Sequence, residues 1–230
     1  MREFVPERGD QVHWDFVLSC FEPVTRVTGG IGSYTRLLLE QLQQVTIDGR
    51  PLNVLFFTGE RQRSDELFQF CPTATVHFVP EFAHVGRSPL NNLGDPYRHF
   101  GYGIMRSMRV MARMGHTFGM FEMPDYSSEG YYVMKAARFG LLNIGATAVR
   151  LHSPLFMLHE DNDQLPWCDS SAFRFHDMER YCLEHADQVL YGGDAMLDRV
   201  CSLVSPTLSA AVREKAVKIP HPWPRAEASK

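Results

Sequence analysis

The sequence predicts a single α/β domain with a mainly parallel sheet and helices on both faces. Short apolar, β-branched or aromatic runs alternate along the chain with longer segments of helical period, which is the pattern of βαβ units. The chain has 230 residues, of which 44% are hydrophobic, enough to bury one sizeable core. We therefore expect one Rossmann-like domain over residues 1–220, followed by a linker or tail over 221–230.

The strands are expected where the apolar runs are short. They are predicted at Trp14–Phe21, Leu52–Thr58, Thr75–Val79, Thr117–Met123, Ala146–Leu151, Gln188–Tyr191 and Ala216–Ile219. The helices are expected where apolar residues recur at helical spacing. They are predicted at Gly30–Val45, Tyr97–Met114, Ser128–Phe139, Trp167–Ala186 and near Ala195–Val204. The loop Pro80–Pro96 is too long for a simple connection, and loops of that length are usually functional.

Composition and charge exclude several classes of protein. The net charge of -4 provides no global positive field for nucleic acid or an anionic membrane. The five cysteines are scattered without metal-like spacing, which is typical of thiols in a reducing compartment. Residues 1–10 carry no apolar signal region, and no run approaches the ~18 apolar residues of a membrane span. We expect a cytoplasmic protein without a transmembrane segment.

The most informative motif is glycine-rich and lies between the first predicted strand and helix. It reads Gly29-Gly30-Ile31-Gly32-Ser33-Tyr34. Glycines allow close approach of a ligand to the backbone, and a helix N-terminus offers free N–H groups to a phosphate or sugar hydroxyl. The alternative is a tight strand-to-helix turn with no ligand. A dinucleotide fingerprint fits less well, because Thr35 stands where its third glycine would be.

A second polar group follows the strand predicted at Thr117–Met123. In open α/β sheets, ligands bind outside the carboxyl ends of the strands. Glu122, Asp125 and Tyr126 are therefore candidates to hold a polyol by hydrogen bonds. The alternative is a capped helix start, with Asp125 or Ser127 as the N-cap.

A third candidate group, His152 and Ser153, follows the strand predicted at Ala146–Leu151. A histidine at this edge could exchange a hydrogen bond with a sugar hydroxyl close to the reacting carbon. A lone histidine is more often structural, and the case for function comes from the edge that it shares with the other two motifs.

Two further groups give weaker signals. His159–Asp161 together with His152 fits no closed zinc pattern, and a solvated acidic loop is favoured. Arg106, Arg109 and Arg113 recur at helical spacing beside a row of methionines. We interpret this stripe as the solvated face of an ordinary helix, the alternative being a dock for a membrane-borne or phosphorylated acceptor.

Taken in order, the motifs resemble the N-terminal domain of retaining glycosyltransferases of family four, which have two facing Rossmann-like domains of the GT-B type. The resemblance runs from about Asp15 to Pro222. Its landmarks are Gly29–Gly32, Glu122–Pro124 with Gly130, Arg150–Pro154, Glu179–Tyr181 through Ala186–Val189, and Val217–Pro222.

The resemblance implies transfer of a sugar, with retention, from a nucleotide-sugar to a carbohydrate, lipid or small-molecule acceptor. His152 would contact the donor sugar as the catalytic residue. The binding residues would be Gly29, Gly30, Ile31, Gly32, Tyr34, Glu122, Asp125, Tyr126 and Ser153. No metal or cofactor is expected. A donor-binding domain is expected in cis or in trans because the chain has no length left for it, and a homo-oligomer is compatible with the sequence.

Two departures from the family pattern lie near the end of the chain. Gly192-Gly193 stand where the family usually has a serine, and His221 stands where asparagine is common.

The alternative function, from a different class, is a non-catalytic carbohydrate-binding or interaction module derived from such a domain.

Overall fold

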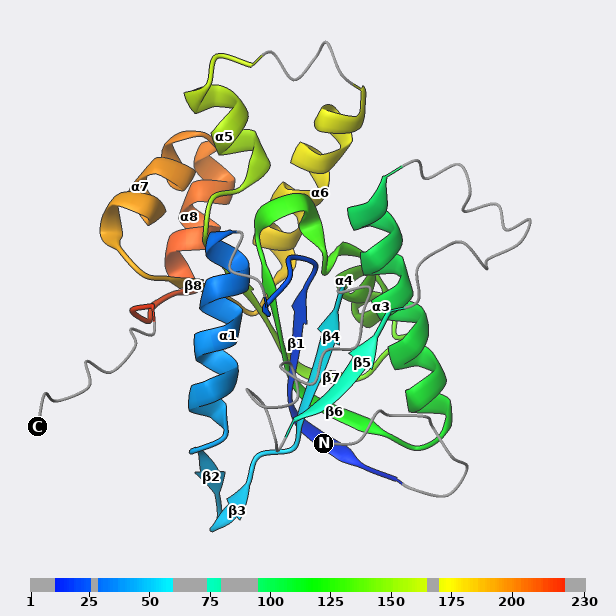
Figure 1. Cartoon of the computed structure of the whole chain (residues 1–230). Coiled ribbons are helices and arrows are strands. Elements are labelled where there is room, and N and C mark those ends of the chain that lie inside the picture. Colours follow the sequence, from blue (N-terminus) through cyan, green and yellow to red (C-terminus); the bar gives the residue numbers. More distant parts are fainter. Residues whose placement is uncertain (1–10, 26–28, 60–73, 80–94, 165–169, 222–230) are drawn as a thin grey trace, which may run out of the picture.

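The computed structural model describes residues 11–25, 29–59, 74–79, 95–164 and 170–221. Seven strands form one sheet in the order β5-β4-β1-β6-β7-β8-β9, and every neighbouring pair in it is parallel (Figure 1). The predicted α/β domain with a mainly parallel sheet is confirmed.

The seven strands lie close to the predicted runs. They are β1 His13–Cys20, β4 Val54–Thr58, β5 Thr75–Phe78, β6 Thr117–Pro124, β7 Ile144–Arg150, β8 Gln188–Tyr191 and β9 Ala216–Lys218. The helices of the described chain connect them and differ more from prediction. They are α1 Gly30–Leu42, α3 Pro96–Arg113, α4 Tyr131–Arg138, α5 Leu155–Asp161, α6 Ser170–His185, α7 Asp194–Ser202 and α8 Pro206–Glu214.

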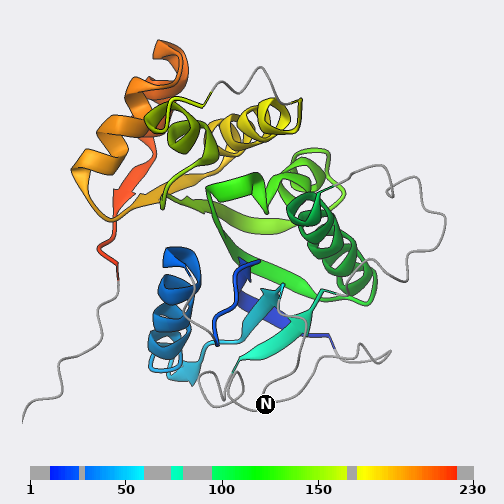
Figure 2. The ribbon, with the colours of Figure 1, turned by 45° about the horizontal axis from the view of Figure 1, so that its top comes forward.

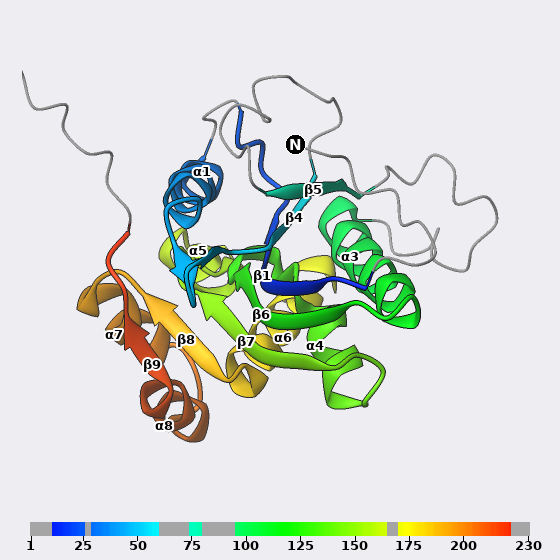
Figure 3. The same cartoon turned by 90° about the horizontal axis from the view of Figure 1, so that it is seen from below.

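The sheet has a hydrophobic core on each face. On one face, α1 packs over β1 and β4 through a cluster that includes Leu18, Leu39 and Phe56. On the other face, α3, α4 and α6 pack over the central strands in a larger cluster that includes Phe121 and Leu183. Figures 2 and 3 show α1 on one side of the sheet and α3 on the other. None of the described helices is long and apolar enough to cross a bilayer.

Several elements differ from the sequence prediction. The predicted helix Ser128–Phe139 begins later than expected, because Ser128 belongs to the 3-10 turn Tyr126–Ser128 and α4 begins only at Tyr131. A two-stranded hairpin, β2 Thr46–Ile47 and β3 Arg50–Pro51, was not predicted. Its Asp48-Gly49 turn has positive φ at both residues, which is the usual signature of a two-residue hairpin. Helices α5 and α8 were also missed, and residues 80–94 of the predicted long loop lie outside the described residues.

Candidate active site

A pocket of about 570 Å³ opens at the carboxyl ends of β1, β6 and β7, against the first turn of α1. Its polar lining comes from Glu22, Ser33, His152, Ser153 and His221. Most of the remaining lining side chains are apolar or aromatic and come from α1, α5 and the turn after β6; they are Ile31, Tyr34, Leu37, Tyr126 and Leu158. The strand ends that the sequence singled out therefore do meet around one pocket, as parallel strands require.

The glycine-rich motif forms the start of α1, and an acidic side chain takes the place of its missing N-cap. Gly29 is the N-cap residue, with extended backbone and no side chain to cap the helix. The Glu22 carboxylate instead accepts the N–H of Gly32 at 2.9 Å. A Cβ on Gly32 would lie 2.5 Å from the carbonyl oxygen of Pro23, so the loop backbone packs directly on the helix. Gly30 and Ile31 line the pocket, whereas Gly29 and Gly32 shape the turn.

Glu122 lies beneath the pocket rather than in it. Its carboxylate is buried, accepts the Tyr34 hydroxyl at 2.8 Å and pairs with Arg150 Nε at 3.2 Å. The Arg150 guanidinium also lies over the Tyr34 ring, 4.9 Å from its centroid. Burial and the adjacent Glu122 carboxylate raise the pKa of Tyr34 well above its usual value, so this phenol stays neutral. Glu122 therefore influences the pocket by fixing the side chain of Tyr34, which lines it.

Asp125 is also buried, and it organises the turn after β7. Its carboxylate accepts the backbone N–H of His152 at 3.0 Å and that of Ser153 at 3.4 Å. Burial raises the pKa of Asp125 to about 7. Asp125 occupies the N-cap position of the 3-10 turn but makes no side-chain cap there. It is absent from the pocket lining, where Tyr126 and the two residues that Asp125 holds are present.

His152 lies in an aromatic group on the pocket wall. Its ring meets the Tyr34 ring edge-on, with centroids 4.8 Å apart, and stacks on His221 at 5.4 Å with an interplanar angle of 3°. Burial, followed by His221 and Arg150, lowers the pKa of His152 to about 3. Burial, followed by Arg150, also lowers the pKa of His221. Both imidazoles are therefore neutral at pH 7, and each can donate one hydrogen bond and accept one.

A strained turn carries Tyr126 to the pocket. Ser127 and Ser128 have φ of 55° and 54°, in the left-handed region that serine rarely adopts. The buried Glu179 stabilises this turn, because its Oε1 accepts the N–H of Ser127 at 2.9 Å. The same carboxylate accepts the first N–H groups of α5, from Leu155 and Phe156. Glu179 thus joins two segments that line the pocket.

Several residues of this arrangement were not predicted as site residues. Among them are Glu22, Arg150, Glu179 and His221. Arg150 and Glu179 stand within stretches that carry the family resemblance, which was the available signal. His221 was assigned to the predicted tail, although it stands within the landmark Val217–Pro222, where the family commonly has asparagine. Glu22 follows the first strand, and that position was the only hint of its contact with α1.

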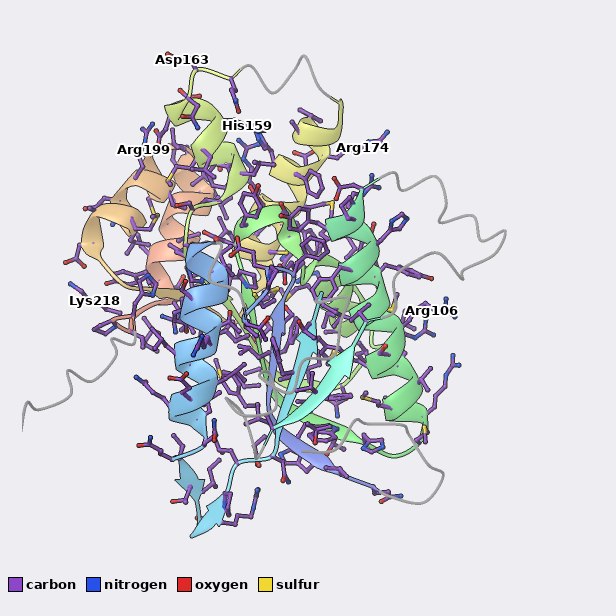
Figure 4. All side chains as sticks on the ribbon, in the orientation of Figure 1. Arg106, His159, Asp163, Arg174, Arg199 and Lys218 are labelled. Carbon is purple, nitrogen blue, oxygen red and sulfur yellow. The ribbon has the colours of Figure 1, made fainter. Side chains whose placement is uncertain are left out.

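The two weaker sequence signals have structural explanations. His159 Nδ1 lies 2.9 Å from His176 Nε2, and Asp161 pairs with Arg199. Within the described residues, no group of three or more His, Cys, Asp or Glu is placed to bind a metal ion. On α3, the methionines at 105, 108 and 111 are buried while Arg106 points outward (Figure 4). Arg106 and Arg113 thus lie on the exposed face of an amphipathic helix, and Arg109 is half-buried beside them.

The seven-stranded parallel sheet and the helices that flank it match one Rossmann-like half of a GT-B-type architecture. No family model and no curated protein sequence matches the chain. Among solved structures, a UDP-glucosyltransferase from Polygonum tinctorium capable of glucosylating indoxyl matches with a TM-score of 0.53 and 10% identity, over 96% of this chain and 55% of that one.

Two further solved structures are similar with TM-scores of 0.47. A protein from O. sativa, in complex with UDP, is 15% identical over 88% of this chain and 50% of its own. A Medicago truncatula protein complexed with UDP-glucose is 9% identical over 84% of this chain and 49% of its own. The chain spans about half the length of these neighbours. The likeness to the Polygonum tinctorium structure establishes the fold. The resemblance to glycosyltransferase family four stays a prediction.

Proposed function

We propose that this chain is the acceptor-side domain of a glycosyltransferase that moves a sugar from a nucleotide-sugar to an acceptor. The observation that carries the proposal is the pocket at the N-terminus of α1, lined by two neutral imidazoles, in a fold matched by half of a UDP-glucosyltransferase. The α1 N-terminus is suited to the donor diphosphate, and the imidazoles to hydroxyl groups. The nucleotide would be held mainly by a second domain, and no metal is required.

The pocket also favours one type of acceptor. Ile31 and Leu37 of α1, Leu158 of α5 and the ring of Tyr126 contribute apolar surface to its wall. Burial of apolar ligand surface against this part of the wall is favourable, whereas hydroxyl groups placed against its aliphatic side chains would lose water without gaining a hydrogen bond. We propose a small-molecule or lipid acceptor with an apolar part that lies against these side chains.

His152 is proposed as the catalytic contact. Its backbone is fixed by Asp125 and its ring by Tyr34 and His221, so the imidazole is held in one orientation toward the pocket. A hydrogen bond to the donor sugar that strengthens as the glycosidic bond breaks would lower the barrier more than it aids ground-state binding. His152→Ala should then reduce turnover on the order of 10²-fold.

The experiment measures transfer and binding on the same preparations. A panel of nucleotide-sugars is tested for binding and for transfer to apolar alcohols and phenols, with and without a donor-binding domain supplied in trans. His185→Ala is the matched control, because this histidine ends α6 and does not line the pocket. The proposal fails if no nucleotide-sugar binds, or if His152→Ala transfers as fast as wild type. Binding without transfer in any combination would support a non-catalytic carbohydrate-binding module instead.

Retention at the anomeric carbon is the part of the proposal that rests on the family resemblance. The anomeric coupling constant in the proton NMR spectrum of the product tests it directly. An α-linked product from an α-linked donor supports retention, and a β-linked product contradicts it.

A further inference from the structure

His221 lies three residues beyond the end of β9, yet it forms part of the pocket wall. Its ring stacks on His152 and meets Tyr34 edge-on with centroids 5.3 Å apart. The residue thus lines the same pocket as the proposed catalytic histidine, although the two are 69 positions apart in the chain. A residue of a simple linker would have no reason to make these contacts.

The backbone before His221 is fixed to the sheet. Ile219 donates its N–H to the carbonyl of Tyr191 at 2.9 Å, which extends the pairing of β9 with β8. The Ile219 carbonyl accepts Arg150 Nη1 at 3.0 Å, and that guanidinium is itself held by Glu122. The anchor lies two residues from His221, so the imidazole is carried to the pocket by the sheet and by a buried arginine.

Gly192 provides the space that the imidazole occupies. A Cβ at this position would lie 3.0 Å from His221 Nε2 and 3.1 Å from its Cδ2. The backbone conformation gives no other reason for glycine, because Gly192 is not among the residues with positive φ. Its neighbour Gly193 has open space at the same point. The two departures from the family pattern, glycine for serine and histidine for asparagine, are therefore in contact with each other.

We propose that His221 and His152 form one binding site in which the two imidazoles hydrogen-bond hydroxyl groups of the same sugar ring. The absence of a side chain at Gly192 leaves the room that the His221 ring occupies. This inference rests on the proposed function and adds a binding residue to it. The neutral state of both rings suits hydroxyl groups, which donate and accept, better than phosphate, which only accepts.

The test follows the imidazole signals of isotope-labelled histidine by NMR while ligand is added. The ligands are UDP-glucose, UDP-N-acetylglucosamine and GDP-mannose, with UDP and GDP alone as references. We expect at least one nucleotide-sugar to shift the signals of both His152 and His221, and the free nucleotide to shift them much less. The variants Gly192→Ala and His221→Ala should each weaken binding about tenfold, the effect of one lost hydrogen bond.

Gly193→Ala is the matched control and should bind as wild type does. The double variant Gly192→Ala/His221→Ala should bind no more weakly than His221→Ala, because both changes remove the same contact. If His152 shifts and His221 does not, or if Gly192→Ala binds as tightly as wild type, this inference is wrong and the proposed function stands. If neither imidazole responds to any of the nucleotide-sugars, with a donor-binding domain supplied in trans as well as without it, the proposed function fails and this inference fails with it.

Discussion

Replacing Arg150 by methionine tests how much the buried ion pair between Arg150 and Glu122, which lies under the pocket, contributes to stability. The Arg150 and Glu122 side chains are 3% and 4% exposed, so neither reaches bulk water. Methionine fills similar volume but leaves the Glu122 carboxylate, among its side-chain hydrogen bonds to described residues, with the Tyr34 hydroxyl. It also removes the donor to the Ile219 carbonyl. The free energy of unfolding should therefore fall.

The magnitude follows from the burial of both partners. Breaking one side of a buried ion pair typically costs about 3–5 kcal/mol, because an uncompensated charge remains. For a domain of this size each kcal/mol shifts the melting temperature by roughly 2–4 °C, so a decrease of roughly 10 °C is expected. Adding Glu122→Gln to Arg150→Met removes the orphaned charge and should restore at least about 1 kcal/mol.

The assay is urea unfolding followed by circular dichroism, with the midpoint and slope fitted for each variant. Arg213→Met is the control, because Arg213 pairs with Asp198 at the surface and its loss should leave the midpoint unchanged. An Arg150→Met midpoint equal to wild type would show that the pair contributes nothing. A double variant less stable than Arg150→Met would show that the orphaned charge is not the cause.

Three more changes probe the rest of the pocket region. Gly32→Ala places a Cβ 2.5 Å from the Pro23 carbonyl and should destabilise the domain by about 1–3 kcal/mol in urea unfolding. Glu22→Gln removes the negative charge at the α1 N-terminus and should strengthen UDP binding roughly two- to fivefold by calorimetry. Burial raises the pKa of Glu129 to about 8, so its contribution to stability is complete below pH 4.5 and is lost as the pH rises through 8. Glu129→Gln should flatten that decline in urea midpoints, since its amide oxygen can still accept the Phe21 N–H.

Each of these three predictions has a clear contrary result. Gly30→Ala is the control for Gly32→Ala, because a Cβ at Gly30 meets nothing within 4 Å, and equal stability of the two variants would refute the steric explanation. Unchanged or weaker UDP binding in Glu22→Gln would mean that the carboxylate does not compete with the diphosphate. If the urea midpoint of Glu129→Gln declines with pH as that of the wild type does, a group other than Glu129 causes the decline.

Most of the fold could be predicted from local patterns. The strand β8 was predicted at its observed bounds, and the other six strands to within two residues, because apolar runs at strand spacing are visible without knowledge of the fold. Helix α4 was placed too early, since a helical period cannot reveal that Glu179 stabilises Ser127 in a left-handed conformation. The missed hairpin at Asp48-Gly49 did carry a local signal, which the strand patterns on either side were too short to support.

For the site, the sequence determined which strand ends carry polar groups, because side-chain chemistry and chain order are fixed before folding. Only the tertiary structure decided the roles within it. Glu122 and Asp125 became buried supports, whereas His221 came to the pocket wall beside His152. Sheet register and the room left by Gly192 set those positions, and both depend on contacts between residues far apart in the chain. No local pattern encodes such distances, so these assignments required the folded molecule.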